Sequence, residues 1–428
     1  MKFNWLLLFV IFHALTFKKF RLMAQNIEFD DVIYDEDIYT VQLYREPDRK
    51  TPPIIGLYGD APLTLRFDDL SGRPATYSWT LFLCDNEWKP TILPQNYYLK
   101  GTLREDITEF AYSFGGAPSF VTYRTSVPSE NLKPLFSGNY ILYVFKDFDF
   151  YKPVFTKRLF VVENITEPQG VIKESGGGFL FRKGQDIMFT VDVKPLSMLN
   201  PLSDIVVSVY QNFRKDNTKH NLKPMFYQGT LLDFRHIDGS NSFAGWNEYR
   251  LLDLRTLNIR PSRALTMTEG EDHVMSIVMA ADSSRNGKSH TLYADLNGTM
   301  QIHTLDGRDP DTDAKYVRVS LRLYSPDGPE KFGSVYLMGQ LCDYALKTDC
   351  KMNYDEKEKI FHKELFLKQG VYSYLYVRDR NQGNDSWQLE GSHSGAENNY
   401  LILVYFKDPL SRVHRIVGFK NLNSLRDR

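Results

Sequence analysis

The sequence is poor in the residues that build metal and catalytic centres. Its 428 residues include only 3 cysteines and 9 histidines, and the histidines are scattered along the chain. It contains no Gly-x-Ser-x-Gly or His-Glu-x-x-His motif and no complete glycine-rich loop of the kind that cradles a nucleotide phosphate. We therefore predict that the protein is not an enzyme and that it has no catalytic residues, metal site or cofactor.

An excess of charge of one sign is also missing. Lys and Arg together number 52 and Asp and Glu together number 53, which gives a formal net charge of −1 at pH 7. A strongly basic chain attracts nucleic acid or an anionic membrane through its overall field, and this composition creates no such field. We predict no nucleic-acid partner, and no small-molecule substrate is indicated.

Long apolar runs are missing except for one near the N-terminus. The run from Trp5 to Phe17 has the length of the apolar core of a secretory signal and is too short to span a bilayer comfortably. We predict a signal peptide at residues 1–24, either cleaved after Ala24 or retained as an anchor. The mature protein is then soluble or peripheral to a membrane.

The few cysteines leave two alternatives open. Cys342 and Cys350 could close a short loop through a disulfide in an exported protein, whereas Cys84 has no obvious partner. Buried, unreactive thiols are the other interpretation. A metal site would need a further ligand nearby, and a catalytic thiol would need a positioned base.

Aromatic residues, in contrast, are abundant. They make up 14% of the sequence, with 29 Phe and 26 Tyr, and they favour pleated, half-buried surfaces over helices. From Tyr77 to Cys84 the side chains alternate between two faces that both carry large groups, which predicts a central strand. Similar strands recur along the chain between Pro, Gly, Asn and Asp residues, and this pattern is typical of antiparallel β-sandwiches.

Two loop-rich stretches divide these strands into three groups. The first boundary lies at residues 164–178, which are rich in glycine, and the second lies at residues 305–314, which are rich in aspartate. We predict an all-β fold of tandem immunoglobulin-like β-sandwiches, with an N-terminal sandwich at 26–165, a middle β-rich domain at 166–305 and a C-terminal immunoglobulin-like sandwich at 306–428. The last of these domains, with a tyrosine-rich strand after Gly370, resembles a starch-binding-type (E-set) module.

The stretch from Phe67 to Trp88 contains acids that invite a catalytic interpretation. Asp68 and Asp69 precede the central strand, and Asp85 follows it. A carboxylate site needs a paired acid and base, and no histidine or metal-ligand spacing lies nearby. Acids that flank a strand usually form turns, so we interpret these three as turn formers.

A second group of acids has the spacing of a calcium loop. Asp309, Asp311 and Asp313 occupy its first, third and fifth positions. Such a loop needs glycine at its sixth position and a bidentate acid at its twelfth, where this chain has Ala314 and Ser320. We interpret the string as a solvated acidic linker, with an adventitious calcium site as the alternative.

Some of the aromatic residues suggest a different function. Trp88, Trp387 and the pair Tyr97 and Tyr98 could stack on sugar rings if they lay exposed and coplanar in a groove. A glycan-binding periplasmic or surface protein is therefore our alternative prediction. The exposure of these side chains decides between this function and sheet packing.

Several short segments resemble, in order, one known family. They are FDDL at 67–70, CDNEW at 84–88, SGNY at 137–140, QN at 211–212, NEYR at 247–250, GVYSYLY at 370–376, EGSH at 390–393 and EN at 397–398 followed by Tyr400. Together they resemble the plug proteins of the type IX secretion system of the Bacteroidota, formerly a domain-of-unknown-function family. The family-motif residues, which we expect to be mostly structural, are Phe67, Asp68, Asp69, Cys84, Asp85, Trp88, Asn139, Asn247, Glu248, Arg250, Glu390 and Glu397.

The resemblance implies a non-enzymatic plug in the periplasm, associated with the inner face of the outer membrane. Its partner would be the giant outer-membrane β-barrel translocon of the type IX secretion system. The plug would bind the periplasmic opening of that barrel and seal it in the resting state. The balanced charge of the chain suits a mixed polar and aromatic interface that can dissociate.

Overall fold

The computed structural model describes residues 27–59, 61–196, 200–379 and 386–428. The predicted signal peptide, residues 1–24, lies outside this range. Within it, none of the helices has the length and apolarity that crossing a bilayer requires.

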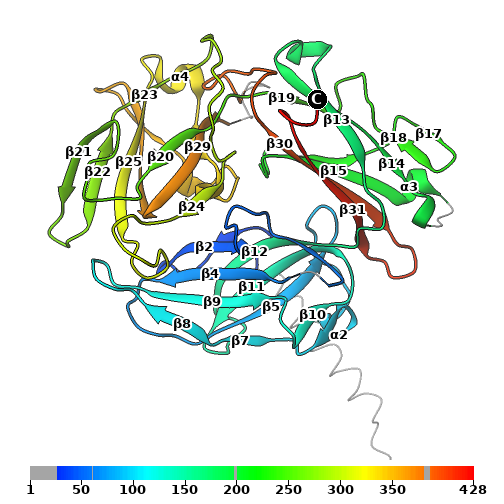
Figure 1. Cartoon of the computed structure of the whole chain (residues 1–428), viewed down its shortest axis with the longest axis horizontal. Helices are drawn as coiled ribbons and strands as arrows, with labels where there is room; N and C mark the ends of the chain where they lie inside the picture. Colours follow the sequence, from blue (N-terminus) through cyan, green and yellow to red (C-terminus); the bar gives the residue numbers. More distant parts are fainter. Residues whose placement is uncertain (1–26, 60, 197–199, 380–385) are drawn as a thin grey trace, which may run out of the picture.

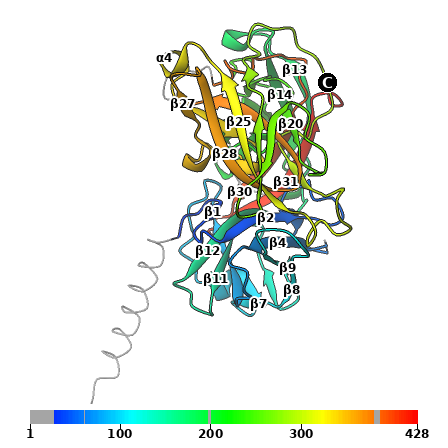
Figure 2. The same ribbon diagram turned by 90° about the vertical axis from the view of Figure 1, so that its left-hand side faces the viewer.

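The strands form three β-sandwiches, which we call units 1, 2 and 3. Unit 1 comprises residues 27–163, unit 2 comprises residues 164–245 together with 399–428, and unit 3 comprises residues 246–398. Figure 1 shows unit 1 along the bottom, unit 3 at the upper left and unit 2 at the upper right, and Figure 2 shows the other two units above unit 1. The prediction of an all-β fold of tandem β-sandwiches is confirmed.

Unit 1 pairs the sheet β2-β4-β9-β8 with the strands β12-β11-β5-β7. As predicted, β5 is a central strand: Trp79 and Leu81 lie in the core between the sheets, while Phe82 packs on the opposite side. The strands of unit 1 are β1 (Val32–Ile33), β2 (Ile38–Tyr44), β3 (Ile54–Gly56), β4 (Leu63–Asp69), β5 (Tyr77–Cys84), β6 (Leu99–Gly101), β7 (Glu105–Ile107), β8 (Glu109–Tyr112), β9 (Val121–Val127), β10 (Leu132–Pro134), β11 (Gly138–Lys146) and β12 (Pro153–Val162).

Unit 2 is built from two distant parts of the chain. Its sheet β13-β14-β18-β17 packs against β16-β15-β30-β31, and the core between them joins side chains such as Phe189 and Val207 to Ile402 and Val417. The strands are β13 (Gln169–Glu174), β14 (Gly184–Asp192), β15 (Ile205–Gln211), β16 (Lys219–Leu222), β17 (Phe226–Gln228), β18 (Leu231–Asp233), β19 (Ser242–Ala244), β30 (Asn399–Lys407) and β31 (His414–Asn423).

Unit 3 packs the sheet β21-β22-β25-β28-β27 against β20-β29-β24 and the adjoining β26. The tyrosines of β29, Tyr372, Tyr374 and Tyr376, are buried in the core between the sheets. The strands are β20 (Arg250–Asp253), β21 (Ala264–Glu269), β22 (Met275–Met279), β23 (Asp282–Ser283), β24 (Met300–Ile302), β25 (Tyr316–Tyr324), β26 (Val335–Met338), β27 (Asn353–Asp355), β28 (Ile360–Lys368) and β29 (Gly370–Arg378).

Helices in the described residues are short. The α-helices are α2 (Gln95–Tyr98), α3 (Pro201–Asp204) and α4 (Gly328–Phe332), and the 3₁₀ helices are η1 (Gly178–Leu180), η2 (Lys194–Leu196), η3 (Gln340–Cys342) and η4 (Thr348–Cys350). A disulfide joins Cys342 to Cys350, whereas Cys84 is a buried free thiol.

One ten-stranded sheet continues from unit 1 into unit 2. The strands β12 and β31 pair in parallel at Val162 and Ile416, so six strands of unit 1 and four strands of unit 2 belong to the same sheet. The linker between the units lies against β31, and a Cβ atom at Gly418 would come within 2.1 Å of the carbonyl oxygen of Thr166. Only glycine allows this close approach of the two backbones. Units 1 and 2 are therefore joined through backbone pairing as well as side-chain packing.

Two of the predicted domain ranges are corrected by this arrangement. The range 306–428 is wrong as a single sandwich because β30 and β31 pair with β15 and pack in the core of unit 2. The range 166–305 is wrong because β20 to β24 belong to the sheets of unit 3. The physical reason is that β30 is apolar on both faces and so requires a buried central position, which the sheet of unit 2 provides.

This exchange of strands makes a prediction about isolated fragments. A polypeptide of residues 246–398 contains every strand of unit 3, so we expect it to fold and to melt in one cooperative transition. A polypeptide of residues 306–428 lacks β20 to β24 and carries β30 and β31 without their partners, so we expect no such transition. Calorimetry of the two fragments checks this, and cooperative melting of the second alone would contradict the strand assignment.

Candidate functional site

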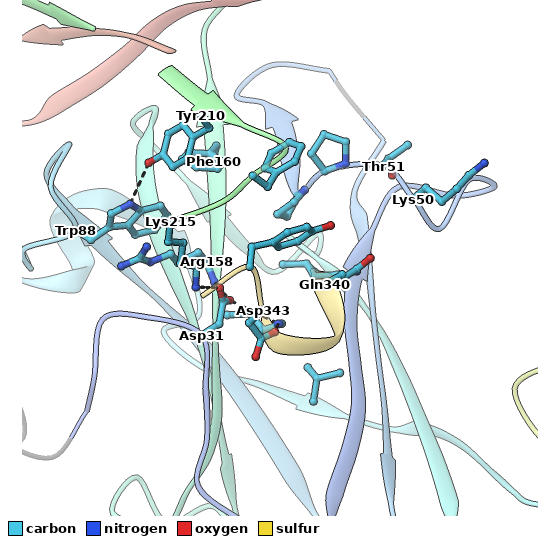
Figure 3. Close-up of a pocket in the computed structure, with 17 residues that line it drawn as sticks. Asp31, Lys50, Thr51, Trp88, Arg158, Phe160, Tyr210, Lys215, Gln340 and Asp343 are labelled. Atoms are coloured by element: carbon cyan, nitrogen blue, oxygen red, sulfur yellow. Dashed lines mark hydrogen bonds and ion pairs between the residues drawn. The ribbon is translucent and has the colours of Figure 1, made fainter. Parts of the chain in front are cut away.

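The three units meet around a cavity of about 90 Å³. The close-up in Figure 3 shows Asp31, Arg158, Lys215 and Asp343 close together, with the aromatic side chains of Trp88 and Tyr210 beside them. Unit 1 contributes Asp31, Trp88, Lys157, Arg158 and Phe160 among others, unit 2 contributes Tyr210, Phe213 and Lys215, and unit 3 contributes Gln340, Asp343 and Tyr344.

A network of opposite charges connects the units at this junction. Lys157 of β12 lies between Asp31 and Asp343, with 3.6 Å from its Nζ to the nearer oxygen of Asp31 and a closer ion pair to Asp343 of unit 3. Lys215 of unit 2 forms ion pairs with Asp30 and Asp31 of unit 1. The side chains of Asp31, Lys157 and Asp343 are 12%, 15% and 18% exposed, so solvent screens these pairs only in part.

Burial and ion pairing shift the pKa values of Asp31 and Lys157 in opposite directions. Burial raises the pKa of the Asp31 carboxyl, but Lys157 and Lys215 lower it by more and hold it well below its ordinary value. Burial lowers the pKa of Lys157, and Asp31 and Asp343 raise it above its ordinary value. Asp31 and Lys157 therefore stay charged across the physiological range, and moving unit 2 or unit 3 away would take a partner from one of these charges.

The cysteine pair supports the contribution of unit 3 to this network. The disulfide closes the short loop that contains Asp343, which directly follows η3 and has a positive φ of 51°. Asp343 also forms an ion pair with Lys347 of the same loop. The covalent link thus limits the conformations of the loop that presents Asp343 to Lys157.

Trp88 occupies the seam between units 1 and 2. Its ring lies under the guanidinium of Arg158, with 4.3 Å from the ring centroid to Cζ, and its Nε1 donates to the hydroxyl of Tyr210 at 3.4 Å. The side chain is 5% exposed. A tryptophan held in this way contributes apolar contact and a cation–π interaction to the junction.

A buried ion pair connects units 1 and 3. Asp68 of β4 accepts hydrogen bonds from Nζ of Lys368 at 2.6 Å and from the hydroxyl of Tyr316 at 2.7 Å. The two charged side chains are 3% and 2% exposed, and Nζ of Lys368 lies 4.1 Å from the centre of the Phe120 ring. The interpretation of Asp68 as a turn former is therefore corrected: it lies inside a strand and holds two units together.

The acidic string after residue 308 contributes to the same interface. Asp311 accepts from Arg49 at 2.7 and 2.9 Å and lies 2.6 Å from Arg66, both of them in unit 1. Asp313 instead accepts the backbone N–H groups of Arg308 and Asp309. The interpretation of this string as a solvated linker is thus wrong for Asp311, whose carboxylate is engaged by two arginines.

Within unit 3, the motif residues Arg250 and Glu390 form a buried pair. Arg250 contacts the two carboxylate oxygens of Glu390 at 3.0 Å each, and Arg285 donates to the same carboxylate at 2.6 Å. The backbone N–H of Tyr376 donates to it as well. Burial raises the pKa of Glu390, but Arg250 and Arg285 lower it below its ordinary value. Asn247 donates to the backbone carbonyl of Glu390 at 3.0 Å and completes this group.

The pKa of Glu248, another motif residue, is shifted in the opposite direction from that of Glu390. It is completely buried, and its Oε1 lies 3.0 Å from Nε2 of His290 and 3.3 Å from the backbone N of Glu397. Burial raises the pKa of the Glu248 carboxyl to about 7, and it raises that of nearby Asp295 to about 7 as well. These carboxyls therefore change charge near neutral pH, unlike the carboxyls at the junction.

The other motif residues shape the surroundings of these contacts. Phe67 stacks on Tyr123 in the core of unit 1, and Asp69 accepts from the hydroxyl of Tyr77 at 2.7 Å. The Oδ1 of Asp85 accepts the backbone N–H groups of Glu87 and Lys89 in the turn around Trp88, as predicted for a turn former. Asn139 bridges units 1 and 2: its side chain donates to the carbonyl of Asp85 and accepts from the hydroxyl of Tyr405, each at 2.8 Å. The side chain of Asn423 donates to Glu397 at 2.8 Å. Cys84 is a buried free thiol.

Comparison with known proteins places unit 1 in a family. Residues 23–163 match the family model "Type 9 secretion system plug protein 1st domain". Unit 1 is a type 9 secretion system plug first domain. The family resemblance seen in the sequence is confirmed for this domain, and the other two units lie beyond the matched residues.

Among solved structures, 25 chains match this chain. One is the crystal structure of a hypothetical protein from Parabacteroides merdae ATCC 43184, which is 25% identical with a TM-score of 0.86. The match covers 93% of this chain and 100% of that chain. A comparison with curated proteins finds no match.

Most of the aromatic side chains that the glycan alternative depends on are not exposed. Trp88 and Tyr98 are buried, and Trp387 is only 8% exposed. Tyr97 is half exposed, but it stacks on Phe136 of the same unit. In the part of the chain that the structure describes, no three or more His, Cys, Asp or Glu side chains are grouped so that they could hold a metal ion.

Replacing Asp68 of the plug domain tests the ion pair between units 1 and 3. Asp68→Asn keeps the shape of the side chain but leaves the ammonium of Lys368 buried without its counter-charge, so we expect a loss of about 3–5 kcal/mol in the free energy of unfolding. Urea titration measures this loss. Asp327→Asn is the matched control because it breaks an ion pair whose side chains are half exposed, and we expect no measurable change. Equal effects of the two substitutions would contradict the role of Asp68.

The raised pKa of Glu248 predicts a pH dependence of stability. The folded state holds the proton of Glu248 up to about pH 7, whereas the unfolded chain releases it near the ordinary value of 4.5. The stabilisation is therefore complete below pH 4.5 and is lost as the pH rises through 7. We expect the melting temperature of Glu248→Gln to fall less than that of the wild type between about pH 5 and about pH 8. Identical pH profiles would show that this carboxyl titrates normally.

Proposed function

We propose that the protein is a non-enzymatic plug that binds the periplasmic opening of the giant outer-membrane β-barrel translocon of the type IX secretion system. In the resting state it seals this opening. The observation that carries the proposal is the match of residues 23–163 to the first domain of the plug family. The protein acts in the periplasm, at the inner face of the outer membrane.

The way in which the units are joined supports this function. A body that closes a wide pore has to resist deformation, because relative motion of its parts would open a path for solutes. Units 1 and 2 share one sheet, and buried ion pairs join unit 3 to unit 1. These connections oppose the hinge motion that is otherwise expected between domains with small polar interfaces.

A pull-down tests the proposed binding. Tagged protein added to a detergent extract of outer membranes should recover the giant barrel, and extract from a strain without the barrel gene should give no such band. The purified partners should form a complex at micromolar concentration. Failure of the intact, folded protein to bind the purified barrel would refute the proposal.

The sealing role has its own measurement. Deleting the gene should increase the entry of a small dye through the outer membrane, because the barrel is left open. A strain that lacks both genes is the control, and its permeability should return to that of the wild type. Unchanged dye entry in the single deletion would count against sealing even if binding were observed.

A further inference from the structure

The two most exposed large apolar side chains among the described residues belong to two segments that line one cleft. Leu410 is 94% exposed and Ile92 is 88% exposed. Ile92 lines a cleft of about 240 Å³ between the loop after β5 and the turn between β30 and β31. Leu410 is in that turn, two residues before Arg412, which also lines the cleft. We call this feature the 92/410 cleft.

Both side chains are presented on ordered turns. The backbone N of Leu410 donates to Asp408 at 2.9 Å, and the side chain of Ser411 donates to the same carboxylate at 2.8 Å. On the other side of the cleft, the backbone N of Thr91, next to Ile92, donates to the carbonyl of Leu83 at 3.0 Å. These hydrogen bonds fix the backbones that carry the two apolar tips, which lowers the entropic cost of binding there.

The two walls of the cleft are also tied to each other. Nδ1 of His414 in unit 2 lies 2.7 Å from Oδ1 of Asn86 in unit 1. Asn86 in turn donates to Asn221 at 2.8 Å. The cleft thus continues the seam between units 1 and 2 to the surface, and its shape is fixed before any partner arrives.

The chemistry of the lining defines what the cleft can bind. Leu83, Leu93 and Val413 provide apolar contact, while Lys89 and Arg412 place two cations at the cleft. The carboxylate of Asp85 also lines it and accepts two backbone N–H groups of its own turn. Among the described residues, Arg412 forms no ion pair, and Lys89 pairs with exposed Glu87. A partner with an apolar side chain next to a carboxylate complements this surface. The apolar side chain would displace water from the apolar lining, and the carboxylate would pair with one of the cations.

We propose that the 92/410 cleft is a docking site for the translocon and receives a loop of that partner in which an apolar side chain adjoins a carboxylate. This assignment rests on the proposed function and adds to it the surface through which the plug binds. A lipid surface fits less well, because the site is a concave cleft and not a flat face.

A pair of charge substitutions tests the proposal. In Ile92→Glu with Leu410→Glu, both replaced side chains are exposed, so the melting temperature should not change. The affinity for the purified barrel should fall at least roughly tenfold, as expected when apolar anchors of an interface are lost. The matched control is Phe114→Glu with Ile237→Glu, which changes one exposed apolar residue in each of the same two units and should bind like the wild type.

The outcomes separate the docking site from the function. If the wild type binds the barrel and the Ile92/Leu410 variant binds equally well, the docking site is refuted and the plug function stands. If the wild type does not bind, both are refuted. Arg412→Ala should bind more weakly and with a smaller dependence on salt than the wild type, and an unchanged salt dependence would refute the predicted carboxylate.

Two other occupants are checked with the same variants. Sedimentation should show a monomer for the wild type, and self-association that the Ile92/Leu410 variant loses would overturn the proposal in favour of a second copy. Vesicles of phosphatidylethanolamine and phosphatidylglycerol should not bind the wild type. Binding to them that the variant loses would overturn the proposal in favour of the membrane.

Discussion

The pairing of β31 with strands on both of its sides is the constraint on which the rest of the structure depends. On one side β31 completes the sheet of unit 2 with β30, and on the other it meets β12 of unit 1. Side chains from both units, including Ile141, Phe160 and Leu403, then form one cluster against this shared sheet. Burying each such side chain contributes about 1.5–3 kcal/mol, so the two units could separate only at a cost comparable to unfolding one of them.

Unit 3 is held in a different way, through charges. Its contacts with unit 1 include the pairs Asp68–Lys368 and Asp343–Lys157, all of them with little exposure to water. Removing charges from water is expensive, so such pairs add little net stability, but any other docking angle would leave them unpaired at a cost of several kcal/mol. Apolar contact is not directional, so by itself it would allow the two units to slide against each other. The charges therefore select one relative orientation of the units.

The sequence was a good guide to the strands and a poor guide to their partners. The alternation from Tyr77 to Cys84 predicted β5 because a buried strand leaves a period of two in its own residues. The apolar run of β30 was also recognised as a buried strand, but nothing in it states that its neighbour is β15, almost two hundred residues away. The predicted domain boundaries were wrong for that reason. A run of glycines or aspartates indicates a loop, but it does not show where the chain passes from one hydrophobic core to the next.

The same limit applies to the site. Asp68 was singled out by the family motif, yet its role depends on Lys368, a single lysine at the end of an otherwise ordinary strand. Asp31 and Lys215 carried no signal at all because a charge next to a turn is usually solvated. The arginines around Glu390 show the exception: Arg250 and Glu390 both belong to motif segments, so the family resemblance marked two residues that the fold brings together.

The division of unit 2 between two parts of the chain also sets an order of events during synthesis. Unit 1 has all its strands once about the first third of the chain has emerged, whereas β15 waits for β30, which is made near the end. Until then the apolar faces of β14 and β15 lack their cover and are open to chaperones and proteases. A chain that stops early cannot form the seam between units 1 and 2, nor the cleft at its surface. Only a fully synthesised chain, which contains β30 and β31, can therefore complete the fold.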